Sequence, residues 1–443
     1  MKLFSNQDLR KLIIPLVLEQ LLIITVGMAD TMMVSSASEV CVSAVSLVDI
    51  INVMISGVLS AIATGGAVVI SQQIGKKNIQ GANIASKQLF YTCFIIGITI
   101  CGLTLCFKEP LLHLFYDGVE QDVMNHAITY LTILGCAYPF IAMYQAIAAI
   151  LRSMRCSNIT FKVSVFMNII NVIGNAIGVL VLKLGIIGVA IPSLLSYIIG
   201  SFIMYVVISN KKRVIYFKQE PIYLDYQMIK EILHISIPNG IENGLFYLGR
   251  VLVVSIISGF ATYQIAANGV ANNLDTLGLL LGFAFNQATI TVIGQCVGAN
   301  DEEQVRYYAK KLIILLYISA AILNILILLF IDPILDLYQV STQTKALSKI
   351  LVWLHNGSAI LIWPIAFTLP NVLRACNDVK HTMYISVFSM FAFRIGVGYL
   401  LGSSCGLGAI GVWLGLVLDW IFRTFMYGYR YLSNRWRKQA GFV

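Results

Sequence analysis

The chain has 443 residues, of which 58% are apolar and only 12% are charged. Globular proteins carry about 25% charged residues, so this composition excludes an ordinary water-soluble domain and favours an integral membrane protein. The net charge of +9 does not indicate a nucleic-acid partner, because most Lys and Arg residues lie at both termini and in alternate connections between apolar runs. This positive-inside distribution places both termini in the cytoplasm.

The apolar residues form twelve runs that are long enough to cross about 30 Å of hydrocarbon as helices. Their approximate windows are 12–34, 43–66, 88–107, 127–150, 161–182, 187–209, 233–257, 265–288, 311–331, 350–372, 383–403 and 408–428. The predicted fold class is therefore an all-α integral membrane protein with twelve transmembrane helices. The polar residues before the first run lead directly into it, so we expect no cleaved signal peptide.

The second half of the chain repeats the first with a nearly constant offset. The recurring residues include Pro15 and Pro238, Glu19 and Glu242, Gln72 and Gln295, Gly75 and Gly298, Gly185 and Gly408, and Arg152 and Arg374. Each copy holds an even number of runs, so both copies enter the membrane in the same direction as a parallel repeat. We expect two six-helix lobes around a central cleft. The predicted divisions are an N-terminal lobe (1–209), a cytoplasmic linker (210–230), a C-terminal lobe (231–430) and a cytoplasmic tail (431–443).

Prolines and a glycine pair mark candidate bends in these spans, because a proline removes a backbone hydrogen bond from a helix. Pro15 and Pro238 either lie in a first turn, where proline is harmless, or bend their spans. Pro364 and Pro370 lie deeper in the tenth span and are better candidates for a kink. The remaining candidates are Gly65, Gly66 and Pro139.

Acidic side chains in the outer half of the first lobe lack a basic partner at the same depth. Asp30 lies near the outer end of the first span and Asp49 near that of the second, while Asn168, Asn171 and Asn175 form a polar stripe on the fifth. Burial and a second nearby carboxylate both favour the protonated form of a carboxyl group. These five residues are predicted to bind a proton or a small cation. Alternatively, the amides join helices by hydrogen bonds and water reaches the acids.

The second lobe carries both acids and arginines inside its spans. Arg394 and Asp419 lie at the same depth on consecutive spans and are predicted to pair, either as a structural clamp or as part of a gate. The other buried charges of this lobe form a predicted polar site that comprises Glu242, Arg250 and Asp275.

The repeat places different polar residues at equivalent positions of the two lobes. Asp49 aligns with Asn272 and Asn52 aligns with Asp275, so each lobe has one acid and one amide in swapped order. This asymmetry suggests that one lobe binds the coupling ion and the other contributes more to substrate handling.

The sequence contains no feature typical of an enzyme or a cofactor-binding protein. It has no nucleophile with a base at motif spacing, no Walker loop and no metal-ligand cluster, so we expect neither catalysis nor a cofactor. The nine cysteines show no CxxC spacing, and we predict no disulfide. Among the five histidines, only His355, which is next to Asn356, is considered as a candidate functional residue.

Several motifs together resemble the multidrug and toxic compound extrusion (MATE) family. They are Pro15-Leu-Val-Leu-Glu19, Val26-Gly-Met-Ala-Asp30, Gln72-Gln-Ile-Gly75, Ser236-Ile-Pro-Asn-Gly-Ile-Glu242, Gln295-Cys-Val-Gly298 and Phe393-Arg394-Ile-Gly-Val-Gly-Tyr399. The resemblance covers essentially the whole chain. It implies a prokaryotic inner-membrane antiporter that exchanges protons or sodium for amphipathic, often cationic compounds by rocking two lobes.

The resemblance also implies a role for individual residues. Asp30 matches the first-span acid of the family's cation site. The family often has an Asn and an Asp one turn apart on the fifth span, where this chain has Asn171 and Asn175 and therefore lacks the acid. Glu242 lies on the seventh span, where many members use an acid, but the tenth span has no acid.

The function predicted from the sequence is secondary-active multidrug efflux. Its partners are small amphipathic substrates, H⁺ or Na⁺ and the lipid bilayer, without nucleic acid, and the expected oligomeric state is a monomer. The alternative is a flippase or exporter of lipid-linked precursors, whose cleft for anionic headgroups would be rich in arginine. The outer half of the first lobe has none, which favours cationic substrates.

Overall fold

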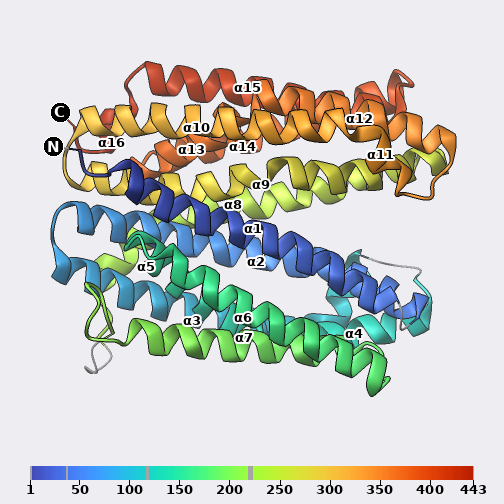
Figure 1. Cartoon of the computed structure of the whole chain (residues 1–443), viewed down its shortest axis with the longest axis horizontal. Helices are drawn as coiled ribbons and strands as arrows, with labels where there is room; N and C mark the ends of the chain where they lie inside the picture. Colours follow the sequence, from blue (N-terminus) through green and yellow to red (C-terminus); the bar gives the residue numbers. More distant parts are fainter. Residues whose placement is uncertain (1, 36–37, 116–118, 218–222, 443) are drawn as a thin grey trace. The chain divides into compact units, whose positions relative to one another are not determined.

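The computed structural model describes residues 2–35, 38–115, 119–217 and 223–442, and in these ranges the regular structure is entirely helical (Figure 1). The helices of the first copy are α1 (Asn6–Ser35), α2 (Glu39–Gly75), α3 (Ile79–Phe115), α4 (Gln121–Gly135), α5 (Tyr138–Ser153), α6 (Ser157–Asn175), the π-helix η1 (Ala176–Val181) and α7 (Ile187–Ile208). Those of the second copy are α8 (Tyr226–Ser258), α9 (Thr262–Gly298), α10 (Glu302–Leu329), α11 (Ile331–Asp336), α12 (Thr342–Leu361), α13 (Trp363–Ala375), α14 (Val379–Ser389), the π-helices η2 (Met390–Val397) and η3 (Leu400–Ser404), α15 (Gly408–Leu432) and α16 (Trp436–Gln439).

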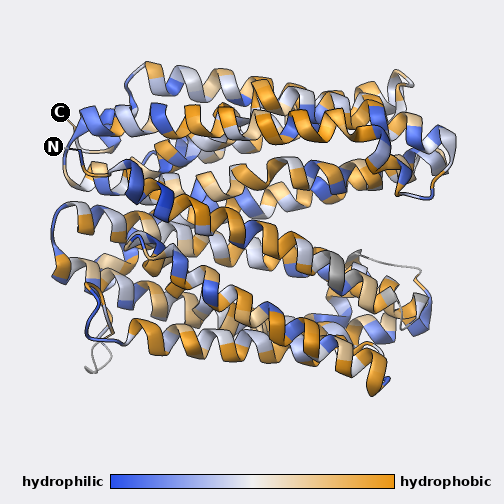
Figure 2. Cartoon of the chain, in the orientation of Figure 1, coloured by the Kyte–Doolittle hydropathy of each residue, from blue (hydrophilic) through white to orange (hydrophobic). Residues whose placement is uncertain are grey.

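Ten helices of the described chain are long and apolar enough to cross a membrane, and two bent pairs bring the number to twelve when each pair counts as one span. Figure 2 shows hydrophobic residues along most of the length of these helices and hydrophilic residues near many of their ends. The predicted all-α membrane fold with twelve spans is confirmed. Several helices extend beyond the predicted windows, because their polar end residues continue the helical hydrogen bonding after the apolar run ends.

The two bent pairs occupy equivalent places in the two copies. The axes of α4 and α5 differ by 45°, and those of α12 and α13 differ by 49°. Pro139 and Pro364 lie in the first turn of α5 and of α13, just after each break. The predicted bends at these two prolines are confirmed.

The other candidate bends lie inside continuous helices. Pro15 lies within α1, Pro238 within α8 and Pro370 within α13, so none of them is a first-turn residue. The pair Gly65 and Gly66 leaves α2 unbroken. A proline inside a long helix is tolerated when neighbouring groups satisfy the freed carbonyl.

The backbone repeats between the copies in detail. Phe107 and Phe330 leave the helical conformation in the same way, at φ −114°, ψ 19° and φ −99°, ψ 18°, just before a proline in each copy. The π-helices η1 and η3 end equivalent spans. Residues with left-handed backbone also recur in pairs, namely Lys77 and Asn300, Arg155 and Asn377, Lys183 and Gly406, and Gly185 and Gly408. The predicted duplication therefore extends to the turns.

The chain forms two compact units, which we call the first unit (Phe4–Gly240) and the second unit (Met1–Leu3 with Ile241–Val443). The division falls inside α8 and not in the predicted linker 210–230, of which residues 218–222 lie outside the described part of the chain. Ser236 and Asn239, at the start of α8, donate hydrogen bonds to the carbonyls of Ile62 and Ala61 on α2, at 3.0 and 3.1 Å. These bonds hold the first turns of α8 on the first unit.

Glycine at position 65 permits this close packing of α8 on α2. A Cβ atom there would lie 2.1 Å from Ser236 Oγ and 2.8 Å from the Ser236 nitrogen. Any larger residue would have to push the two helices apart.

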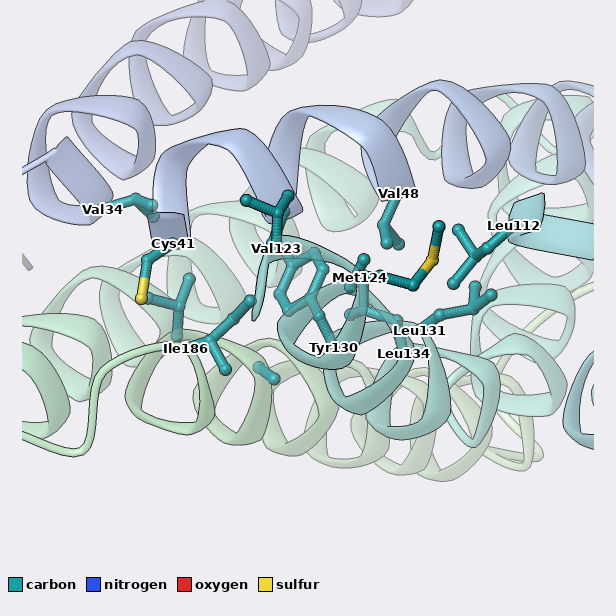
Figure 3. Packing of buried hydrophobic residues seen from close by; sticks show 14 of the residues in the cluster. Val34, Cys41, Val48, Leu112, Val123, Met124, Tyr130, Leu131, Leu134 and Ile186 are labelled. Atoms are coloured by element: carbon teal, nitrogen blue, oxygen red, sulfur yellow. The ribbon is translucent and has the colours of Figure 1, made fainter. Parts of the chain in front are cut away.

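One apolar cluster of the first unit gathers residues of α1, α2, α3 and α7 around α4 (Figure 3). Val34, Val48 and Leu112 belong to this cluster together with Tyr130 and Leu131 of α4. Asp30 lies one helical turn before Val34, and Asp49 directly follows Val48. The cluster therefore fixes the helices that carry the two acids.

Candidate functional site

Two helices of the first unit bring an acid and an amide together. Asn175 on α6 donates from Nδ2 to Oδ1 of Asp30 on α1 at 2.8 Å. Asp30 is half-buried, while Asn175 is fully buried and Asn171 nearly so. Residues four apart share one helix face, so Asn171 and Asn175 both face α1. A hydrogen bond from a neutral amide to a charged carboxylate is stronger than one between two neutral groups.

The Asn171 amide also lies against Asp30. Its nitrogen is 3.0 and 3.2 Å from the two oxygens of Asp30, and its oxygen accepts a hydrogen bond from Ser193 Oγ at 3.0 Å. Both ends of the amide are satisfied in this orientation.

The structure does not bring all five predicted residues of the first lobe into contact. The side chain of Asp49 is exposed, and within the described chain its carboxylate accepts no hydrogen bond, although it lies within electrostatic reach of Asp30. The phenol groups of Tyr130 and Tyr197 are close enough to Asp30 and Asp49 to interact with them electrostatically. Asn168 is apart from this group and donates to Ser164 Oγ at 3.4 Å.

No Lys, Arg or His among the described residues forms an ion pair with Asp30. Asn175 also presents a buried Oδ1 atom that has no hydrogen-bond partner in the same part of the chain. The site therefore has acceptor oxygens and no compensating positive charge. Such a site can take up a proton or a small cation.

Glu242 of the second unit lies in a buried network with groups from three other helices. Arg374 at the end of α13 places Nη2 2.6 Å from Glu242 Oε2, and Ser386 on α14 donates to Oε1 of the same carboxylate. Ser386 also contacts the hydroxyl of Tyr427 at 2.5 Å and accepts from Arg423 Nη1 at 3.0 Å. Glu242 therefore joins α8 to α13, α14 and α15.

Arg394 and Asp419 form an ion pair, with Arg394 Nη2 2.7 Å from Asp419 Oδ2. Arg423 shares the same carboxylate, with Nε 2.8 Å from Oδ1, and Ser389 donates to it at 2.5 Å. All three charged side chains are at most 4% exposed. The guanidiniums of Arg394 and Arg423 also lie over the rings of Phe246 and Phe367, which favours their charge in this dry surrounding.

The predicted second-lobe polar site is divided in the structure. Glu242 pairs with Arg374, whereas Asp275 on α9 lies 2.7 Å from His355 on α12. Arg250 is exposed and forms no ion pair within the described ranges. The three residues thus contact different neighbours.

Reasoning from the sequence missed Ser193, Arg374, Ser386 and Tyr427. A signal for Arg374 was present in the repeat, because Glu19 and Arg152 recur as Glu242 and Arg374. In the first unit Arg152 Nη1 lies 4.0 Å from Glu19 Oε1. Two charges that recur together predict a pair in each copy. The hydroxyl partners carried no such signal, since serine and tyrosine are common in membrane helices.

The chain matches a family model described as MatE over residues 15–177 and 238–400, which are equivalent segments of the two copies. Among curated proteins, the uncharacterized transporter YisQ of Bacillus subtilis (strain 168) is 26% identical over 433 residues, which cover 96% of this chain and 92% of that protein. The probable multidrug resistance protein NorM of Thermotoga maritima is 25% identical, covering 98% of this chain and 94% of its own length.

Solved structures share the fold. One described as the outward-facing conformation of a multidrug resistance MATE family transporter of the MOP superfamily superposes with a TM-score of 0.90 at 18% identity, covering 98% of this chain and 96% of that chain. The eukaryotic MATE transporter AtDTX14 gives a TM-score of 0.87 at 16% identity, and the superposition covers 98% of this chain and 97% of that chain.

Proposed function

The chain belongs to the MatE family of membrane transporters, and from this premise we propose that it is a secondary-active multidrug efflux antiporter. It exchanges protons, or sodium ions, for amphipathic and often cationic compounds by alternating access. The relatives named as probable multidrug resistance proteins support the substrate class.

The observation that carries this proposal is that Asp30 has no positively charged partner among the described residues. Its carboxylate receives an amide hydrogen bond at 2.8 Å and has no cationic side chain as an ion-pair partner among the described residues. An ionisable group inside a membrane span is costly unless it has a partner or a function. A proton or a sodium ion supplies the missing positive charge.

Asn171 and Ser193 extend the site beyond Asp30. The Asn171 amide lies between the Asp30 carboxyl group and the Ser193 hydroxyl, at 3.0 Å from each. Binding at Asp30 is thereby linked to α7 as well as to α6.

The transporter is expected in the cell inner membrane as a multi-pass monomer with both termini in the cytoplasm. The distribution of Lys and Arg residues between alternate connections supports this orientation. The exchange requires no cofactor and no nucleic acid, because the ion gradient supplies the free energy.

The test is reconstitution of the purified protein into lipid vesicles with an ethidium-type dye as substrate. Dye movement is measured after a pH gradient is imposed and, separately, after a sodium gradient is imposed. We expect one of the gradients to drive exchange and Asp30→Asn to abolish that drive. Asp332→Asn is a matched control, since Asp332 has a 56% exposed side chain that pairs with Lys349.

Two results would contradict the proposal. Dye transport that does not respond to either gradient would exclude antiport. Gradient-driven dye transport by Asp30→Asn at the wild-type level would show that this acid takes no part in the mechanism. Transport of a lipid-linked precursor without dye transport would favour the flippase alternative.

A further inference from the structure

Two cysteine thiols of the first unit lie next to each other at the point where a membrane span is broken. Cys101 belongs to α3, and Cys136 lies between α4 and α5, whose axes differ by 45°. The two thiols are close enough to hydrogen-bond to each other. All nine cysteines of the chain are free thiols in the structure, so this contact is not a covalent bond.

The helix backbones approach closely on both sides of the two thiols. On the turn of α3 before Cys101, a Cβ atom on Gly97 would lie only 2.9 Å from the Cα atom of Pro139. On the turn after Cys101, Thr104 Cγ2 lies 3.4 Å from the point that a Cβ atom on Gly135 would occupy. A disulfide requires Cα atoms about 4.4–6.8 Å apart. Small residues such as these glycines let two helix backbones come so close.

A lysine shows where the pair lies along the span. Lys108 on α3 donates from Nζ to Thr132 Oγ1 on α4 at 3.2 Å. An α-helix rises 1.5 Å per residue, so Cys101 lies about 10 Å from the level of Lys108 along the helix axis. With both termini in the cytoplasm, Lys108 belongs to the outer end of α3. The thiols therefore lie inside the span, in its outer half.

Small reagents can reach this pair, and a hydroxyl group is available beside it. Both cysteines are partly exposed, whereas Cys93 on the same helix is fully buried. The buried Tyr138 hydroxyl has no hydrogen-bond partner within the described residues. It is close enough to the Cys101 thiol to interact with it electrostatically. A phenol donates hydrogen bonds, so this hydroxyl can stabilise the thiolate through which disulfide chemistry proceeds.

We propose that Cys101 and Cys136 form a reversible disulfide when a lipid-soluble quinone reaches them. Each thiol gives up one hydrogen atom as the S–S bond forms, and the quinone accepts the two electrons and two protons to become a quinol. A quinone suits this position because it dissolves in the hydrocarbon that surrounds the span. The disulfide is neutral, so its formation leaves no charge in the apolar region. A dithiol reductant reverses the step by thiol–disulfide exchange.

The bond would join α3 to the place where the next span changes direction. Pro139 has no backbone N–H group, so it cannot continue the hydrogen bonds of α4 into α5. Hinges are commonly a few residues at the ends of helices, and an S–S bond here would fix the angle of this one. Oxidation would then hold the first unit in one shape and stop transport, a consequence that rests on the proposed function.

The second copy lacks this pair. Asn324 and Ala359 occupy the positions that correspond to Cys101 and Cys136. The repeated fold therefore does not require cysteine at either position, and serine variants of the first copy are suitable for a test.

The experiment counts free thiols in the purified full-length protein in lipid vesicles. The vesicles are treated with a short-chain ubiquinone or with buffer, and the protein is then denatured and tagged with a maleimide-polyethylene glycol. We expect the quinone to remove two of the nine taggable thiols and dithiothreitol to restore them. Mass spectrometry of the peptides should show Cys101 linked to Cys136.

Serine variants identify the pair. Cys101→Ser and Cys136→Ser should lose no thiols to the quinone. Cys106→Ser is the matched control, since Cys106 is an exposed cysteine on the same helix, and this variant should still lose two. Oxidised wild-type protein should also lose most of its gradient-driven dye exchange, whereas quinone-treated Cys136→Ser should keep it.

Three results would count against this inference. Nine free thiols in quinone-treated wild-type protein would overturn the proposal, as would a loss of two thiols in Cys101→Ser and Cys136→Ser alike. Full dye exchange by the oxidised protein would overturn the effect on transport. The thiol count needs no transport, so vesicles that show no dye exchange before oxidation would contradict the proposed function and leave the disulfide to be decided by the count.

Discussion

Arg374 joins the end of α13 to Glu242 on α8 through a contact of 2.6 Å between Nη2 and Oε2. Both side chains are about one-tenth exposed, so neither charge is well solvated. The first unit has the same two residue types in equivalent positions, but Arg152 and Glu19 approach only to 4.0 Å. Duplication has preserved this pair in both copies, with the tighter contact in the second.

Removal of Arg374 should destabilise the protein strongly. Arg374→Met leaves Glu242 buried without its cation, and breaking a buried pair in this way typically costs about 3–5 kcal/mol. The free energy of unfolding can be measured in mixed detergent micelles. The double variant Arg374→Met, Glu242→Gln is the control and should recover part of the loss, because it removes the unpaired charge. Equal stability of the single and double variants would contradict the prediction, because it would show that the unpaired Glu242 carries no penalty.

Asn175 and Asn168 should differ in their effect on transport, although both are amides on α6. Asn175 donates to Asp30 at 2.8 Å, whereas Asn168 donates only to Ser164 at 3.4 Å. A hydrogen bond to a charged group contributes about 1.5–3 kcal/mol, so Asn175→Ala should lower gradient-driven dye exchange by at least about tenfold. Asn168→Ala should lower it much less. The same assay in vesicles compares the two, and equal losses would argue against a special role for Asn175.

The buried cluster at Asp419 should respond asymmetrically to substitution. Asp419→Asn leaves the guanidiniums of Arg394 and Arg423 without their shared carboxylate, while Arg394→Gln or Arg423→Gln leaves one arginine to balance it. We therefore expect Asp419→Asn to have the lowest free energy of unfolding of the three. Thermal unfolding in detergent would test the order, and a greater loss in either arginine variant would contradict it.

A titratable cap at the start of α10 should make one part of the stability depend on pH. The backbone and side chain of Gln304 donate hydrogen bonds to Asp301, and these bonds lower the pKa of Asp301 below its usual value. The contribution of Asp301 to the stability is therefore complete at pH values above its unfolded-state pKa of about 3.9. It is lost as the pH falls through the lower folded-state pKa. Asp301→Ala should cost about 1 kcal/mol near neutral pH and progressively less in acid.

The first copy supplies the control for this cap. Asn78 caps α3 in the equivalent place, and its Oδ1 accepts from the Gly81 nitrogen at 2.9 Å. An amide does not titrate, so the loss in Asn78→Ala should be the same at every pH. Unfolding measured from neutral to acidic conditions compares the two variants. A pH-independent loss in Asp301→Ala would exclude the titrating cap.

The orientation in the membrane can be tested at a native cysteine. Cys405 is exposed in the connection between η3 and α15, which should face the cell exterior if both termini are cytoplasmic. A membrane-impermeant maleimide should label it in intact cells, and Cys405→Ser identifies that label. Gln439→Cys, near the C-terminus, should react only after the cells are opened. The opposite pattern would place the termini outside.

Much of the fold follows from features that are visible in the sequence. Apolar runs of sufficient length predicted the spans, and two of the candidate prolines, Pro139 and Pro364, predicted the bends before α5 and α13. The division of the chain inside α8 was not visible, because it depends on hydrogen bonds from Ser236 and Asn239 to carbonyls that any residue provides. The π-helices were also unpredictable, since their hydrogen-bond shift leaves no distinct periodicity over a few residues.

The candidate site was also only partly predictable from the sequence. Helical spacing and depth together placed Asp30 near Asn171 and Asn175, but depth alone also included Asp49 and Asn168. Depth does not determine the rotation of a helix about its axis, so it cannot show which side chains face each other. The contact between Asp275 and His355 was missed because the two residues lie on spans that are not adjacent in sequence.

The two halves share several turns, the two bends and one pair of π-helices, but they differ in several of their ionisable groups. This pattern is expected when two copies of one ancestral gene are joined and each copy then diverges under its own selection. An acid with no ion-pair partner among the described residues lies in one half, and an acid beside a histidine lies in the other, so a single polypeptide holds different polar groups in its two copies. A transporter assembled from two identical subunits would have to carry every such group twice.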